Sequence, residues 1–187
     1  RAKQPNILFL YLDDLGYGDV GFLNAKSKIP TPNIDRLAKA GMSFTDAHTA
    51  AAICGPSRYG LMTGRYPWRA RAPKFGNGTT FGNMWIEKGR MTLASLLKTK
   101  GYNTAQIGKW GIRHNYSDAL KAGVNISGKL TKNDFDFPNK RLLGSNHVGF
   151  SYAWHLTHLS SNKNAKYAFE NGLPSDPKLK FYDPHRW

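Results

Sequence analysis

The hydrophobic pattern of the chain opens on one uninterrupted apolar run. Residues 6–12 read Asn-Ile-Leu-Phe-Leu-Tyr-Leu and end at a pair of aspartates. A run this short, closed by acidic residues and glycine, predicts a fully buried β-strand rather than an amphipathic helix. Shorter apolar segments predict two further strands, at residues 42–45 and 102–107.

Helix signals lie between these strands. They predict helices over residues 33–41, 56–64 and 92–101, opened by Asn, Pro and Thr respectively and each closed by a glycine. Alternation of strands and helices is typical of parallel strands with helices packed on both faces. The pattern therefore predicts an α/β fold, a three-layer sandwich with a mostly parallel central sheet.

Two long stretches, residues 65–89 and 115–149, show no regular pattern. Irregular stretches of that length in a compact domain are typical of segments that line a site or cover another domain. After Gly149 the sequence turns polar and shows no terminal element, so we expect the end at Trp187 to be a cut.

The charge of the chain narrows the classes of partner. Lys and Arg number 27 against 12 Asp and Glu, a formal charge of +15. Such an excess attracts polyanions, whether nucleic acid, anionic lipid or acidic polysaccharide, and does not choose among them. No apolar run approaches the length of a membrane helix, so we expect no membrane span.

Two adjacent carboxylates, Asp13 and Asp14, follow the first predicted strand directly. Ligands of open parallel sheets bind at the carboxyl ends of strands, so this pair is well placed for a hard cation, calcium or magnesium. By itself an Asp-Asp pair is more often a turn cap beside a solvated side chain.

The only cysteine, Cys54, stands in the segment Cys-Gly-Pro-Ser-Arg at the start of a predicted helix. A lone cysteine excludes an internal disulfide and a paired Cys-x-x-Cys site. The positive end of the helix favours an oxyanion and an ionised nucleophile. Arg58 lies about one turn further on, where its guanidinium can bind a tetrahedral anion.

Several segments together resemble one family. Asp-Asp-Leu-Gly-Tyr-Gly-Asp, Thr-Pro-Asn-Ile-Asp-Arg-Leu-Ala, Cys-Gly-Pro-Ser-Arg and Gly-Leu-Met-Thr-Gly-Arg follow one another as in formylglycine-dependent sulfatases of the alkaline phosphatase superfamily. The Gly-Lys-Trp segment also resembles that family, which implies that Lys109 contacts the sulfate and residue 54. The resemblance covers the whole chain, and we expect residues 1–187 to be the N-terminal part of the catalytic domain.

One position departs from the family. Family members commonly have histidine after the tryptophan of Gly-Lys-Trp, whereas this chain has Gly111. We assign the role of that histidine to His114, and Arg113 is the alternative.

Two histidines, His155 and His158, follow Gly149-Phe150, which is similar to a Gly-Phe pair before a substrate-contacting segment of the family. Such histidines are more often packing or surface residues, so neither is assigned to the site.

The resemblance implies a chemistry, a cofactor and partners. Cys54 would be converted to formylglycine by a formylglycine-generating enzyme, and one calcium ion would lie between Asp13, Asp14 and the residue-54 side chain. Further ligands would come from the C-terminal remainder of the protein, in the same chain or as a separate one. The expected substrate is a sulfated carbohydrate. We expect the enzyme to be secreted or periplasmic, and we expect no nucleic acid partner.

Two other functions stay open. A phosphate or phosphonate ester hydrolase of the same superfamily could use the same modified cysteine. A non-catalytic module that binds polyanions would suit the charge and the interleaved aromatic residues. The second alternative gives no reason for Cys-Gly-Pro-Ser-Arg behind Asp-Asp.

Overall fold

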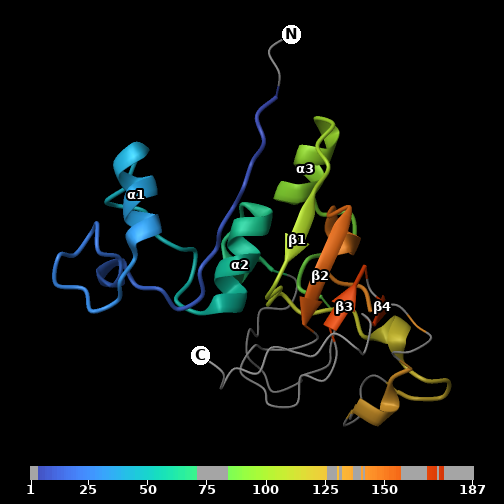
Figure 1. Ribbon diagram of the computed structural model, residues 1–187. Coiled ribbons are helices and arrows are strands. Elements are labelled where there is room, and N and C mark those ends of the chain that lie inside the picture. Colours follow the sequence, from blue (N-terminus) through green and yellow to red (C-terminus); the bar gives the residue numbers. More distant parts are fainter. Residues whose placement is uncertain are drawn as a thin grey trace. The chain divides into compact units, whose positions relative to one another are not determined.

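A computed structural model gives the fold of the chain at residues 4–70, 84–125, 130, 132–136, 140, 142–156, 168–171 and 173–174. The chain divides into two compact units, Arg1–His48 and Thr49–Trp187. Figure 1 shows the helices and strands of both units.

The first unit is built around helix α1 (Pro32–Ala40). Its cap position is Thr31 rather than the predicted Asn33, and Pro32 starts the helix with its fixed φ. The Asp35 carboxylate accepts from the Thr31 hydroxyl at 2.8 Å and from the Phe22 N–H at 2.9 Å. These bonds fasten the preceding loop to the first turn of α1, so the predicted helix is confirmed with a slightly earlier start.

The predicted strands at residues 6–12 and 42–45 are wrong, because both segments lie outside regular structure. The first is extended and exposed: Leu8 is 84% exposed, and the Phe9 and Tyr11 rings stack at 6.2 Å, as alternate side chains of an extended backbone can. An apolar run forms a strand only beside another strand. The described part of the first unit contains none.

In the second unit two predicted helices are confirmed. Helix α2 (Cys54–Thr63) ends at Gly64, whose φ of 64° is the left-handed conformation that glycine adopts easily. Helix α3 (Leu93–Thr99) begins after Thr92, whose hydroxyl accepts from the Ser95 N–H at 3.1 Å. The core around them contains Tyr59, Met62, Ala70, Trp85, Ile86, Ala94, Trp110, Ile112 and Val148.

The sheet has the order β1-β2-β3-β4 (Figure 1). Strand β1 (Ala105–Ile107), predicted from the sequence, pairs in parallel with β2 (Tyr152–Leu156). Strands β3 (Ala168–Glu170) and β4 (Leu173–Pro174) add antiparallel pairs. The parallel pair with its helices fits the predicted α/β class. The three strands after Gly149 correct the expectation that this end has no regular element.

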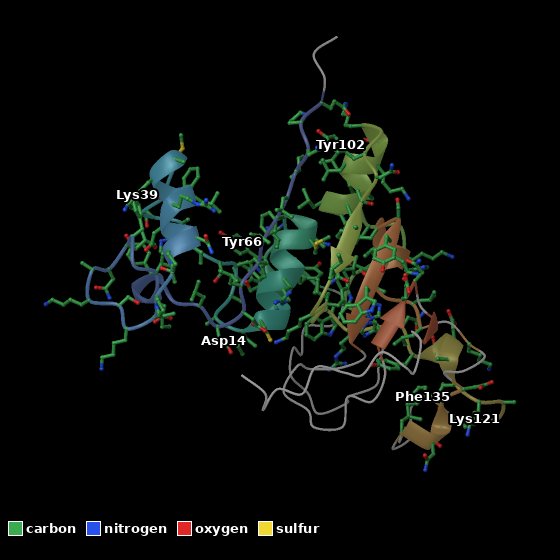
Figure 2. All side chains as sticks on the ribbon, in the orientation of Figure 1. Asp14, Lys39, Tyr66, Tyr102, Lys121 and Phe135 are labelled. Carbon is green, nitrogen blue, oxygen red and sulfur yellow. The ribbon has the colours of Figure 1, made fainter. Side chains whose placement is uncertain are left out.

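The described residues also form short 3₁₀ helices: η1 (Tyr17–Asp19), η2 (Pro67–Arg69), η3 (Ser117–Ala119), η4 (Lys132–Asp134) and η5 (Ser145–Val148). A second small core lies among η3 to η5, where the Tyr116 and Phe135 rings meet edge to face at 5.4 Å. Phe135 is labelled in Figure 2. The described part of stretch 115–149 therefore contains short helices and a small core.

No helix among the described residues has the length and apolar character to cross a membrane.

Candidate functional site

The first turn of α2 presents the candidate nucleophile. Cys54 is the first residue of the helix, carries a free thiol and is half-buried. Ile53 before it is extended, and its carbonyl accepts from the Ser57 N–H at 3.0 Å, which closes the first turn. The N–H groups of this turn and the helix dipole place a partial positive charge beside residue 54. The sequence predicted this placement from Pro56 and the glycine stop.

Arg58 and Lys109 come together although 51 positions separate them in the sequence. Arg58 Nη1 donates to the Lys109 carbonyl oxygen at 2.8 Å, which fixes the arginine across the turn that follows β1. Both residues are half-buried. Two of the predicted site residues therefore meet at the helix that starts with Cys54, and two cations there suit an anionic group.

The turn after β1 packs against α2 with almost no space. A Cβ on Gly55 would lie 2.7 Å from the Gly111 carbonyl oxygen and 2.7 Å from Cζ3 of Trp85. Gly111 has a φ of +73°, and a Cβ there would lie 2.8 Å from Cδ of Arg58. A histidine at position 111 would be strained in this backbone and would press on the Arg58 side chain, which gives a physical reason for the departure from the family pattern.

His114 lies in a buried pair with His155 of β2. The exposed fractions of the two residues are 4% and 0%, and His114 Nε2 lies 3.0 Å from His155 Nδ1. Gly144 leaves room for the pair, since a Cβ there would lie 2.7 Å from His114 Cδ2 and 2.8 Å from His155 Nε2. The Tyr116 ring meets His114 edge to face at 5.9 Å. These contacts give His114 a packing role, and its catalytic assignment stays a prediction.

Sequence reasoning missed four contributors to this neighbourhood. Trp85 falls in an irregular stretch. Gly55 stands inside a motif and Gly111 at a departure from one, and nothing in the sequence indicates that the two touch. The partner of His114, His155, was excluded from the site. The closely spaced glycines of Gly-Lys-Trp-Gly were the available signal, because glycine is common where two backbones approach closely.

The predicted cation ligands lie in the first unit. Asp13 and Asp14 are exposed, and Asp14 has a φ of +59° at the bend that follows the extended segment (Figure 2). Carboxylate oxygens suit calcium, which takes about six to eight oxygen ligands, so this pair fits part of such a site. Among the described residues no three His, Cys, Asp or Glu side chains form a complete metal-binding group.

Comparisons with known proteins agree on one family. A family model described as Sulfatase matches residues 5–176. N-acetylgalactosamine-6-O-sulfatase of Bacteroides thetaiotaomicron is 39% identical over 71% of this chain and 25% of that protein. Arylsulfatase G of Mus musculus is 43% identical over 63% of this chain and 22% of that protein.

A solved structure from the metabolism of multiple glycosaminoglycans by Bacteroides thetaiotaomicron aligns with a TM-score of 0.72 at 31% identity. The alignment covers 94% of this chain and 33% of that one. It confirms the predicted fold class. The chain spans about a quarter of the length of the curated relatives it matches.

Proposed function

The chain belongs to the sulfatase family, and we propose that the protein carrying it hydrolyses sulfate esters of a sulfated polysaccharide at Cys54 converted to formylglycine. The observation that carries the proposal is the contact between Arg58 and the Lys109 carbonyl at the helix that starts with Cys54. It holds a guanidinium on the helix that starts at the nucleophile position. The Lys109 side chain lies close by, since a Cβ at Gly111 would be 2.8 Å from Arg58 Cδ and 3.9 Å from Lys109 Cε. Transfer of an anionic group needs such positive charges beside a helix N-terminus.

The residues of this chain have separable roles in that reaction. Arg58, held by the Lys109 carbonyl, binds two oxygens of the sulfate group, and the Lys109 ammonium neutralises the charge that develops on them. The first turn of α2 adds its dipole. In formylglycine hydrate, one hydroxyl would attack sulfur and displace the alcohol of the ester. The second hydroxyl would then lose its proton and form the aldehyde C=O as the C–O bond to the sulfate breaks.

Charge and relatives support the substrate class. The formal charge of +15 favours a polyanion, and one relative is an N-acetylgalactosamine-6-O-sulfatase. The similar solved structure comes from glycosaminoglycan metabolism. We propose that the protein acts in a secreted or periplasmic location, that residues 1–187 form the N-terminal part of its catalytic domain, and that the remainder completes the site.

The full-length protein, produced with a formylglycine-generating enzyme, tests the function directly. We expect kcat/KM for 4-nitrophenyl sulfate to exceed that for 4-nitrophenyl phosphate at least about 100-fold, because the site is built for the less charged ester. Equal or preferred turnover of the phosphate would instead identify a phosphoric ester hydrolase. Tight binding of sulfated glycan without turnover would identify a binding module.

Calcium should bind through Asp13 and Asp14. In the full-length protein we expect one tight site, and Asp13→Ala should weaken calcium affinity about 100-fold. Calcium at 100 times its Kd adds about 2.7 kcal/mol to the free energy of unfolding of a protein with one site, and Asp13→Ala should lose most of that gain. Titration calorimetry and melting curves measure both quantities.

Asp46→Ala is the matched control for this prediction. Asp46 is also an exposed aspartate of the first unit, 2.7 Å from His48 Nε2, and it is absent from the proposed ligand set. Its substitution should leave calcium affinity unchanged. If Asp13→Ala changes neither calcium affinity nor turnover, the metal assignment is wrong.

A further inference from the structure

The backbone that carries Arg113 is held in an uncommon conformation. Arg113 has a φ of +61°, in the left-handed region that side chains other than glycine rarely adopt. Trp110 Nε1 donates to the Arg113 carbonyl oxygen at 2.9 Å, and Trp110 is itself buried. Strained conformations persist where the surroundings hold them, and they concentrate at ligand sites.

The side chain of Arg113 lies over an aromatic ring that also contacts the helix of Cys54. Its guanidinium carbon is 5.3 Å from the centroid of the Trp85 ring. The edge of the same indole packs on the backbone of Gly55, where an added Cβ would lie 2.7 Å from Cζ3. One buried ring thus connects the guanidinium to the residue directly after the nucleophile position.

This placement costs the charged arginine part of its hydration. Burial lowers the pKa of Arg113, since the charged form loses part of its hydration. Arg58 and Lys109 add positive charge at the same end of α2. This concentration of positive charge favours an anion, and an arginine fixed on an aromatic face presents its N–H donors in the fork that carboxylates and sulfates accept.

Two cations already serve the reacting sulfate in the proposed function. We propose that Arg113 binds a second anionic group of the substrate, a carboxylate or a further sulfate on the sugar that carries the reacting sulfate or on its neighbour. This inference rests on the proposed function and adds a specificity residue to it. Trp85 is the positioning residue that holds the guanidinium beside α2.

The test compares substrates that differ only in their second anionic group. The full-length matured protein and its Arg113→Gln variant are assayed on a glycan disaccharide with one sulfate, on the same disaccharide with a carboxylate, and on one with a second sulfate. For at least one of the dianionic substrates Arg113→Gln should raise KM about tenfold or more, and much less for the monosulfate. The substrate that responds identifies the anionic group.

Two further variants separate binding from folding. Arg90→Gln removes another arginine of the second unit, one that lies 3.4 Å from Glu87, and it should change none of the three KM values. Arg113→Lys keeps the charge but loses the fork, so it should restore only part of the selectivity.

The outcomes distinguish this inference from the function on which it rests. Equal losses by Arg113→Gln on all three substrates, or no loss on any, overturn the role of Arg113 while the sulfatase function stands. A wild-type protein that hydrolyses no sulfate ester overturns the proposed function, and the inference with it.

Discussion

Cys54→Ala in the full-length matured protein should lower kcat for 4-nitrophenyl sulfate by about 10⁴-fold or more, the size of loss seen when a nucleophile is removed. The residue stands at the first position of α2 and is half-buried, so a substrate can reach its side chain at the N-terminus of the helix. Its removal leaves Arg58 and Lys109 in place. The variant should therefore still bind sulfate esters while it no longer cleaves them.

Cys54→Ser is the informative control. A serine hydroxyl can attack sulfur once, but serine has no second hydroxyl on the same carbon that could form an aldehyde and so expel the bound sulfate. At most one sulfate should therefore be transferred to each protein molecule. Peptide mass spectrometry of the wild-type protein should show an aldehyde or its hydrate at residue 54. Full activity with an unmodified thiol, or an active Cys54→Ala variant, would contradict the mechanism.

Much of the second unit could be predicted because its signals are local. Helix α2 is marked by Pro56 and Gly64, and α3 by Thr92 and Gly101. Each signal is a residue whose own backbone or hydroxyl starts or stops a helix, so no distant contact is needed to recognise it. That Arg58 lies about one helical turn after Cys54 could be predicted for the same reason, because both residues belong to one helix.

The errors concern contacts between distant segments. Residues 6–12 are apolar enough for a strand, yet strand formation depends on a neighbour that a single segment cannot reveal. Strand β2 was missed in a segment taken as polar, because its partner β1 lies almost fifty positions away in the sequence. The Arg58–Lys109 contact and the His114–His155 pair are likewise non-local. Sequence spacing supplied the candidates, and the fold determined which of them meet.

Gly111→Ala should lower kcat about 10³-fold, because one added methyl group would displace Arg58. The new Cβ would lie 2.8 Å from Cδ and 3.3 Å from Nε of Arg58, whereas its 3.9 Å distance to Cε of Lys109 is an ordinary van der Waals contact. Arg58 cannot simply swing away, since its Nη1 is bonded to the Lys109 carbonyl. Misplacing a group by about 1 Å can cost about 100-fold in rate, and losing a charge-stabilising donor costs about 100- to 1,000-fold.

Backbone strain alone must be separated from this displacement. Gly101 has a φ of +82°, close to the +73° of Gly111, but a Cβ added at Gly101 meets no atom within 4 Å. Gly101→Ala should therefore cost about 1–2 kcal/mol of unfolding free energy, the penalty of a left-handed alanine, and leave kcat unchanged. Gly111→Ala should show a similar or larger loss of stability together with the loss of rate.

A double variant checks that Gly111 acts through Arg58. Residues that share one interaction show non-additive effects, so Gly111→Ala should lower kcat far less in an Arg58→Ala background than in the wild-type protein. Steady-state kinetics of the four proteins, with melting curves at equal concentration, give the comparison. If the two substitutions lower kcat independently, or if Gly111→Ala and Gly101→Ala lose equal activity, then the tight packing at Gly111 serves the fold rather than the position of Arg58.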